Sequence, residues 1–167
     1  DDKCIRLDFP AGKPEKRKKP AKIIESMSIS DDDYEDIQYC PNTKFLLVKL
    51  KDENLVNRIK PDFNKMISND IDSEGIKSVI ITAESEGKYD FISRCFAPWE
   101  GINEDPVTGS AHTVLASFWS GILNKTSFLA YQASKRGGEL RVKLTEGNSR
   151  VHLTGEAVTV FESEIEV

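Results

Sequence analysis

The chain has 167 residues, of which 38% are hydrophobic and 31% charged, and a formal net charge of −5 at pH 7. That length and composition are typical of one soluble globular domain with its own core. The negative charge argues against a general nucleic-acid binder, and the absence of a long apolar run argues against a membrane-spanning protein.

The first 36 residues predict a strand, a short helix and two charged loops. Residues Cys4 to Phe9 alternate apolar and polar side chains, as a strand does, and Pro10 ends the pattern. Lys13 to Lys19 is a basic run between prolines, which we expect to form a solvated loop. Ala21 to Met27 has the spacing of a short helix, and the acidic residues 28–36 are expected to form a linker or turn.

Residues 37–96 predict strands and two helices. Asp52 can cap a helix from Glu53 to Ile59, and Pro61 is well placed at the start of a second one. The apolar face of the second helix would consist of Phe63, Met66 and Ile67. The expected strands are Ile37–Cys40, Phe45–Leu50, Val79–Ala83 and Tyr89–Phe96. The last strand would carry Phe91, Ser93 and Cys95 on one face and Ile92, Arg94 and Phe96 on the other.

A strongly apolar helix is expected after Thr108. Its apolar residues are three and four apart and its opposite side is apolar too, so it should be buried on most sides. Gly121 and Asn124 can end it. The apolar positions are Ala111, Val114, Leu115, Phe118, Trp119 and Ile122, with Ala116 and Leu123 on the other side.

Short strands separated by turns are expected after this helix. They are Ser127–Ser134, Glu139–Leu144, Arg150–Leu153 and Ala157–Ile165. Many strands and one very apolar helix predict an α+β fold, in which a curved, mostly antiparallel sheet or barrel wraps around the helix.

The entrance to the apolar helix is the candidate chemical site. Thr108 is a plausible N-cap, whose hydroxyl can accept a hydrogen bond from an amide one turn into the helix. The amides of Gly109, Ser110 and Ala111 lack partners inside the helix and form an anion site at its positive end. Asp105 lies just outside as a possible acid/base or orienting group. By residue chemistry alone, a capped core helix whose amides bind water explains these features equally well.

Cysteine and histidine usage predicts neither disulfides nor a metal site. Cys4, Cys40 and Cys95 are odd in number and far apart, which is typical of reduced thiols in a cytoplasmic protein. No pair of them has zinc-site spacing, and only two histidines are present. The chain begins at Asp1 with no signal peptide and no Met, so we expect a processed, cleaved or truncated cytoplasmic chain.

Three stretches of the chain resemble the PhzF-like family of phenazine biosynthesis-like proteins. Most specific is the run from Glu104 to His112, Glu-Asp-Pro-Val-Thr-Gly-Ser-Ala-His, preceded by Arg94-x-Phe96-x-Pro98 and Gly101. Arg136-Gly137-Gly138-Glu139 resembles a glycine-rich stretch of the eukaryotic members, and Ile5 to Pro10 resembles the strand that ends the family's first half. The resemblance covers essentially the whole chain, but only the second half of the family's usual length.

The resemblance implies a fold and a partner domain. Each half of such proteins is a diaminopimelate-epimerase-like domain, with one helix inside a barrel-like sheet and the active site in the cleft between the two halves. Residues 1–167 would then be a single domain equivalent to the C-terminal half, with residues 1–20 as the strand and linker from the first half. The principal acid/base glutamate and a histidine of the site would belong to the missing N-terminal half-domain.

The resemblance also assigns roles to residues at the helix entrance. Asp105 would line the cleft and assist proton transfer, and Gly109 and Ser110 would hold a substrate carboxylate through amides and a hydroxyl. Thr108 stands where epimerase relatives carry a catalytic cysteine, so two-thiol chemistry is not expected. His112 could contact a ligand or bond a neighbouring strand.

Four further residues are candidates for the edge of the cleft. Arg94 could balance Asp105 or a substrate carboxylate, although a structural ion pair is the simpler interpretation. Arg136, Gly137 and Gly138 could border the cleft or simply form a hairpin turn. His152 is interpreted as an ordinary strand residue.

These observations predict an isomerase that transfers a proton on a small carboxylate substrate by general acid/base catalysis, without a metal or organic cofactor. This chain would supply half of the active site and be inactive alone. The alternative is a non-enzymatic interaction module that kept the fold and binds a protein partner through the basic loop Lys16–Lys19 and the acidic loop Asp31–Asp36. The apolar surface of a lone half also makes a homodimer an expected partner state. No nucleic-acid or membrane partner is expected.

Overall fold

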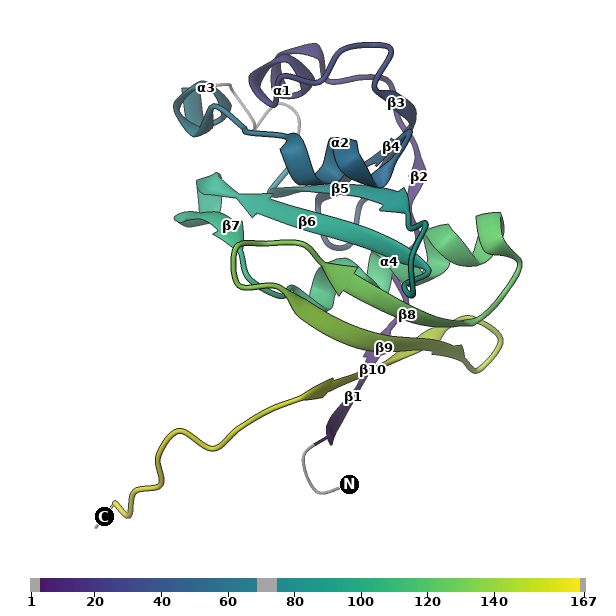
Figure 1. The fold of residues 1–167 in the computed structure, drawn as a ribbon, viewed down its shortest axis with the longest axis vertical. Coiled ribbons are helices and arrows are strands. Elements are labelled where there is room, and N and C mark those ends of the chain that lie inside the picture. Colours follow the sequence, from purple (N-terminus) through teal and green to yellow (C-terminus); the bar gives the residue numbers. More distant parts are fainter. Residues whose placement is uncertain (1–3, 69–74, 166–167) are drawn as a thin grey trace.

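Helix α4 (Gly109–Leu123) runs along the inner face of a curved sheet, as Figure 1 shows. The computed structural model describes residues 4–68 and 75–165. The strands are β1 (Cys4–Pro10), β2 (Glu15–Lys16), β3 (Tyr34–Cys40), β4 (Phe45–Leu50), β5 (Ser78–Glu84), β6 (Phe91–Ala97), β7 (Ile102–Asp105), β8 (Ser127–Gln132), β9 (Gly138–Thr145) and β10 (Arg150–Glu156).

The sheet is mixed but mostly antiparallel. Its order is β1-β10-β9-β8-β6-β5-β4-β3-β2, and the short strand β7 pairs with β6 beside this path. Only the pairs β4–β5 and β6–β8 are parallel among the strands of the described residues. The predicted α+β fold, a mostly antiparallel sheet around one apolar helix, is therefore confirmed.

Helix α4 is buried over most of the stretch from Ala111 to Trp119 because the inner face of the sheet surrounds it, but Ile122, predicted as part of its apolar face, is 46% exposed. The indole of Trp119 is fully buried and stacks on Phe91, with ring centroids 5.6 Å apart. Asn124 ends the helix in the left-handed conformation, at a φ of 50°, while Gly121 lies within the last turn. The remaining inner-face contacts come from β4, β5, β6, β8, β9 and β10, through Leu47, Ile80, Cys95, Phe128, Leu140, Val142, Val151 and Leu153.

Three short helices cover the outer face of β3 to β6 (Figure 1). They are α1 (Ala21–Ser26), α2 (Glu53–Arg58) and α3 (Phe63–Ser68). The predicted cap is confirmed, because Asp52 accepts a hydrogen bond from the amide of Leu55 at 2.9 Å. Met66 is buried as predicted, but Ile67 is 51% exposed, because consecutive residues of a helix point about 100° apart and only Met66 faces the sheet.

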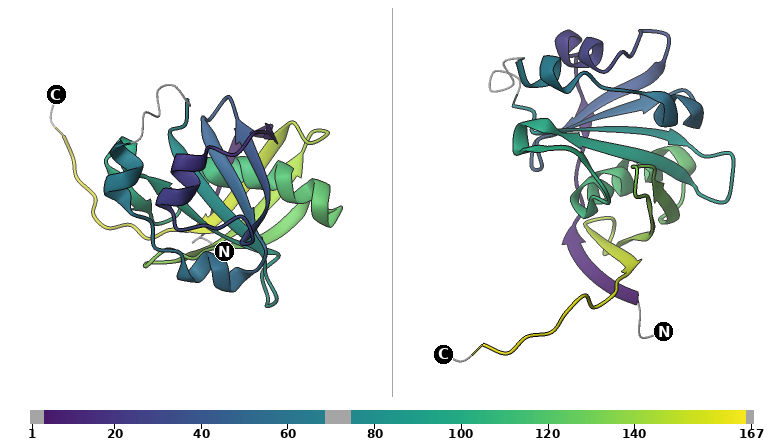
Figure 2. Two further views of the ribbon diagram at one scale, coloured as in Figure 1. Left: turned by 90° about the horizontal axis from the view of Figure 1, so that it is seen from above. Right: turned by 60° about the vertical axis from the view of Figure 1, so that its left-hand side comes forward.

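Strands β8, β9 and β10 pack on α4 with one face only. In β9 the side chains of Leu140, Val142 and Leu144 are buried and the residues between them are exposed. The β1 strand pairs with β10 at the open edge of the sheet, and both it and the C-terminal tail project from the body (Figure 2). Within the described residues, no helix is long and apolar enough to cross a bilayer.

Two sequence predictions about extended segments are wrong. Residues 157–165, expected as a strand, have no regular structure and pair with none of the described strands. A strand pattern is realised only where a neighbour supplies hydrogen bonds, and here Val158, Val160 and Phe161 are 79–86% exposed. The acidic segment 28–36 is not entirely a linker, because β3 already begins at Tyr34, where β4 lies alongside.

Candidate active site

The stretch from Pro98 to Asp105 folds into a tight turn followed by the short strand β7, which the sequence did not predict. The one-turn helix η1 (Pro98–Glu100) ends at Gly101, whose φ of 82° favours glycine. Strand β7 then returns along β6, with Asp105 opposite Cys95. This path delivers Asp105 to the N-terminal end of α4.

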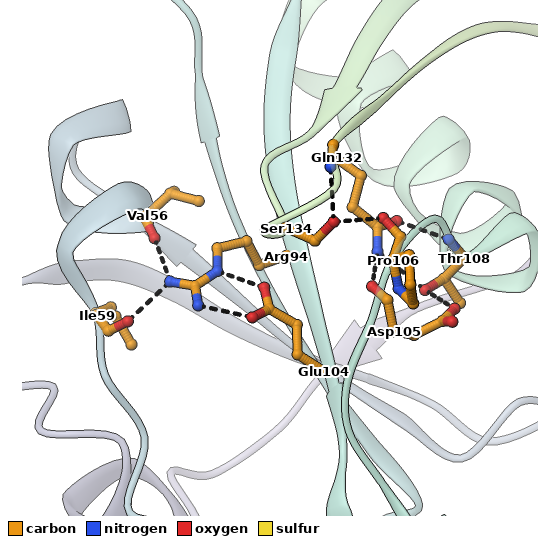
Figure 3. A network of polar contacts seen from close by, with 10 residues as sticks. Val56, Ile59, Arg94, Glu104, Asp105, Pro106, Thr108, Gln132 and Ser134 are labelled. Carbon is orange, nitrogen blue, oxygen red and sulfur yellow. Dashed lines mark hydrogen bonds and ion pairs between the residues drawn. The ribbon is translucent and has the colours of Figure 1, made fainter.

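A buried glutamine holds the loop between β7 and α4 (Figure 3). Gln132, fully buried at the end of β8, accepts a hydrogen bond from the Thr108 amide at 2.8 Å. Its amide nitrogen donates to the Asp105 carbonyl at 2.7 Å and to the Thr108 hydroxyl at 3.1 Å. Three hydrogen bonds from one side chain fix the positions of Asp105 and Thr108.

Thr108 is the cap residue of α4, but its hydroxyl does not cap the helix. The hydroxyl donates instead to a carboxylate oxygen of Asp105. The same hydroxyl accepts from the side-chain amide of Gln132 at 3.1 Å, so bonds to Asp105 and Gln132 replace the predicted capping bond. The exchange leaves the first amides of α4 open.

The start of α4 borders a depression in the surface through Thr108 and Ser110. The amides of Gly109, Ser110 and Ala111 donate to no other group of the described residues. Asp105, Thr108 and Ser110 line the adjacent hollow, which has a volume of about 320 Å³. A carboxylate, the start of a helix and a hydroxyl thus meet at one place.

The opposite wall of this hollow carries an ion pair that the sequence did not single out. The Lys77 ammonium lies 3.1 Å from a carboxylate oxygen of Glu100, and each side chain is about half exposed. Lys77 precedes β5 and Glu100 belongs to η1, so neither position follows a periodic pattern. Among the residues that line the hollow, Lys77 is the one cation.

His112 lies behind the hollow and does not line it. Its Nδ1 is 2.8 Å from the carbonyl oxygen of Thr108 and must carry the proton, because a carbonyl can only accept. Burial of the ring lowers the pKa of His112 to about 4, although the bond to Thr108 opposes the shift. The imidazole is therefore neutral at pH 7 and braces the start of its own helix rather than a neighbouring strand.

Cys95 forms the floor of the hollow as an unreactive thiol. Burial raises its pKa to about 12, and the negative charges of Asp105 and Glu104 act in the same direction, whereas the Thr108 hydroxyl opposes them. A thiol of this pKa supplies almost no thiolate at neutral pH.

Arg94 does not reach the hollow. It points to the helix-covered face of β6, where it makes a two-pronged ion pair with Glu104, at 2.7 and 3.0 Å, rather than with Asp105 (Figure 3). Its remaining nitrogen donates to the carbonyls of Val56 and Ile59 at 3.1 and 2.8 Å. All three of its nitrogens are used to join β6, β7 and α2, which is a structural role.

The turn from Arg136 to Gly138 supports the site loop from the side away from the hollow. Ser134 donates to the Pro106 carbonyl at 2.7 Å and accepts from the Gly137 amide at 3.1 Å. A Cβ at Gly138 would lie 2.3 Å from a methyl group of Val107, so only glycine allows this close approach. Sequence reasoning missed Ser134 and Gln132, because a polar residue at a strand end carries no signal of its distant partner.

Residues 2–163 match the family model of the phenazine biosynthesis-like proteins, PhzC-PhzF. The chain belongs to this family. A relative called an uncharacterized isomerase, from Halalkalibacterium halodurans, is 43% identical over 164 residues, which are 96% of this chain and 57% of that protein.

Solved structures share the fold. A PhzF family protein of Enterococcus faecalis, 35% identical, superposes with a TM-score of 0.80 over 93% of this chain and 55% of its own. A predicted epimerase of Pseudomonas aeruginosa has a TM-score of 0.65 over 94% of this chain and 59% of its own; at 18% identity it shows the epimerase-like fold alone. The chain thus spans a little more than half the length of these proteins.

Proposed function

We propose that this chain supplies half of the active site of an isomerase, which moves a carbon-bound proton on a small carboxylate substrate by general acid/base catalysis. The observation that carries the proposal is the fixed Asp105–Thr108–Gln132 arrangement beside the open amides of α4. The isomerase name of a relative supports the same reaction class. Such a reaction requires no metal or organic cofactor.

The substrate carboxylate would sit at the start of α4. The amides of Gly109 and Ser110 and the Ser110 hydroxyl would bind it, helped by the positive end of the helix dipole. Lys77, on the opposite wall, could exchange its bond to Glu100 for one to the substrate. Asp105, held by Thr108, would orient the reacting group or relay a proton.

The other acid/base group would come from a part of the protein that this chain does not contain. Thr108 cannot take this role, because a hydroxyl of ordinary pKa is a poor proton carrier at neutral pH. Cys95 cannot take it either, because its pKa is raised to about 12. We therefore expect the purified chain to bind carboxylates without turning them over.

The test is a comparison of two ligands and two variants. Anthranilate, a small aromatic carboxylate, should bind and shift the backbone amide NMR resonances of Gly109 and Ser110. Anthranilamide, in which a neutral amide replaces the carboxylate, should not. Ser110→Ala should weaken anthranilate binding by about threefold to tenfold, since it removes one hydrogen bond. Ser120→Ala, near the other end of the same helix, should change nothing. Equal binding of both ligands would refute the carboxylate site.

A separate assay tests the half-site. Candidate substrates incubated in deuterium oxide with the chain alone should gain no carbon-bound deuterium. Deuterium incorporation by this chain, without another polypeptide, would show that the site is complete and would overturn that part of the proposal.

We further propose that β1 contacts the part of the protein that corresponds to the remaining length of its relatives. Ile5, Leu7 and Phe9 continue the inner apolar face beyond α4 and are 54%, 51% and 38% exposed. A lone chain should bury them by self-association. Sedimentation velocity should show oligomers of the wild-type chain, and Leu7→Lys should dissociate them. A monomeric wild-type chain would contradict the proposed contact surface on β1.

The alternative, a binding module that uses its charged loops, receives no support from the loop contacts. Lys16 pairs with Asp36, and Lys19 pairs with Asp31, so these basic and acidic groups neutralise each other within the chain. We therefore do not favour that function.

A further inference from the structure

The outer face of β8, β9, β10 and β1 carries a group of cations without a role in the site described above. No helix of the described residues covers this face, whereas α1, α2 and α3 cover the outer face of β3 to β6 (Figure 1). We call this group the outer basic face and define it by its five outward side chains, Arg6, Arg141, Lys143, His152 and Thr154.

Strand register brings these five side chains together. Thr154 stands between its cross-strand neighbours Arg141 and Arg6, and Lys143 is directly opposite His152. Neighbouring strands lie about 5 Å apart, and alternate residues of a strand about 7 Å apart. Two guanidinium groups, one ammonium and one imidazole therefore share an area about 10 Å across. Asp8, opposite His152 on β1, lies at its corner with a carboxylate oxygen 3.9 Å from the imidazole.

Within residues 4–68 and 75–165, none of the three permanent cations of this face, Arg6, Arg141 and Lys143, makes a close ion pair with a carboxylate. The charge of Arg141 nevertheless acts on the Glu139 carboxylate of the same strand. The neighbouring cations are neutralised: Arg150 pairs with Asp8 at 2.9 Å, Lys125 with Asp90 at 2.6 Å and Lys88 with Glu139 at 2.8 Å.

This distribution concentrates positive charge in a chain whose net charge is −5. Like charges on neighbouring strand positions repel each other and destabilise a sheet. An anion bound between them would remove that repulsion. The fold does not require these cations, so anion binding would account for their presence.

The same residues line a hollow of about 690 Å³. Hydroxyl-bearing Ser127 and Thr154 lie among the cations on its walls, which also include the Asp90–Lys125 ion pair. Guanidinium groups match the geometry of phosphate oxygens in pairs, and hydroxyls donate to the oxygens that remain. The hollow is on the opposite side of the sheet from α4, so its occupancy does not depend on the candidate active site.

We propose that the outer basic face binds a small ligand bearing phosphate groups. Its extent of about 10 Å suits one or two phosphates, whereas nucleic acid requires a longer basic stripe and a favourable net charge. The ligand class is therefore a phosphorylated small molecule or inorganic phosphate itself, which share the same recognition chemistry.

The test uses inorganic pyrophosphate as the probe and the whole 167-residue chain. At low ionic strength, pyrophosphate should bind saturably and shift the backbone amides of β9 and β10 around Arg141 and Thr154. Inorganic phosphate should bind the same residues more weakly if a two-phosphate group is preferred, and equally well if a single phosphate is the natural occupant.

Matched variants distinguish binding by these particular side chains from a general electrostatic attraction between the ligand and the protein. The double variant Arg141→Gln, Lys143→Gln should weaken pyrophosphate binding by about tenfold or more. The control Lys18→Gln, Lys51→Gln removes the same charge from exposed positions elsewhere and should change affinity by less than about twofold. Thermal melting verifies that both variants fold.

Four results would overturn the proposal. They are the absence of saturable binding, shifts centred on the start of α4, an equal loss in the control variant, and equally tight binding of a glutamate-rich peptide, which would indicate a protein partner. The outcome of this experiment is independent of the proposed function. Ser110→Ala should leave pyrophosphate binding unchanged, and the double variant should leave anthranilate binding unchanged.

Discussion

The two halves of the sheet have different surroundings. Strands β4, β5 and β6 are covered on both faces, by α4 inside and by α1, α2 and α3 outside. Strands β8, β9 and β10 are covered only inside and meet solvent outside. The first half is therefore apolar on both faces, as in Val79–Ala83, whereas β9 alternates between buried and exposed residues.

This difference shows on which face of the sheet a polar group needs a hydrogen-bond partner. On the bare outer face a charged residue is solvated and free to bind a ligand. On the inner face every polar group must find a partner or lose stability. Thr82, Ser93 and Gln132 are neighbours across β5, β6 and β8 and form a buried polar row beneath α4. Thr82 and Gln132 are hydrogen-bonded, and Gln132 connects the row to the site loop, whereas the Ser93 hydroxyl has no partner among the described residues.

The largest predicted effect comes from comparing one substitution on the helix-covered outer face with one on the bare outer face. Ile81→Asn places an amide under the short helices and should cost about 4 kcal/mol of unfolding free energy, through lost burial and an unsatisfied polar group. Lys143→Asn on the bare face should change stability by less than about 0.5 kcal/mol. Urea unfolding of both variants measures the contrast. Similar costs would show that the two halves are not covered differently.

The second prediction concerns pH and the inner face. His112 has a pKa of about 4 in the folded chain against 6.5 when unfolded, so the unfolded chain binds a proton first as the pH falls. The stability due to neutral His112 is complete above pH 6.5 and is lost as the pH falls toward 4, by about 2–4 kcal/mol. Urea unfolding between pH 7 and pH 4 measures this loss.

The matched control for this pH dependence is His112→Gln, whose amide can still donate to the Thr108 carbonyl. It should lose less stability than the wild type over the same pH range, because the carboxylates common to both proteins titrate equally. Identical pH profiles would show that His112 does not titrate as a buried base.

The third prediction tests the buried glutamine. Gln132→Met keeps the volume but removes all three hydrogen bonds, leaving Thr108 and Asp105 with unpaired backbone groups. We expect a loss of about 2–3 kcal/mol and weaker anthranilate binding. Gln38→Met, on β3, removes one bond to Asp36 near solvent and should cost much less. Equal stability of the two variants would refute the positioning role.

The smallest effect concerns thiol access and leaves stability unchanged. Cys4 lies exposed on β1, whereas Cys40 and Cys95 are buried in the inner core. Iodoacetamide at pH 8 should label Cys4 in the native chain and all three cysteines only in denaturant, as intact-mass measurement would show. Native labelling of Cys95 would mean that the floor of the hollow opens to solvent.

Most elements could be predicted because their signals are local. The strand Phe45–Leu50 and the Asp52 cap follow from periodicity and a single capping side chain, and both are where the sequence placed them. The central helix follows from apolar spacing and ends at Asn124. Local hydrogen bonds and side-chain geometry suffice at these positions.

The details of the site could not be predicted, because they depend on residues far apart in the chain. Thr108 has the sequence of a cap, yet its hydroxyl bonds Asp105 while Gln132, 24 residues away, takes the amide. Arg94 pairs with Glu104 rather than Asp105, because alternation along β6 and β7 places the two on the same outer face.

The sequence by itself determined the α+β class, the apolar central helix and the family. Periodicity, capping preferences and a short specific run of residues are properties of neighbouring positions, so they can be read without a structure. Only the tertiary structure decided which hydroxyl, amide and carboxylate pair, that His112 is buried and neutral, and that Arg6 from the beginning of the chain joins Arg141 and Lys143 near its end. Those contacts arise when strands distant in sequence become neighbours in the sheet, and burial then sets the energy of each polar group.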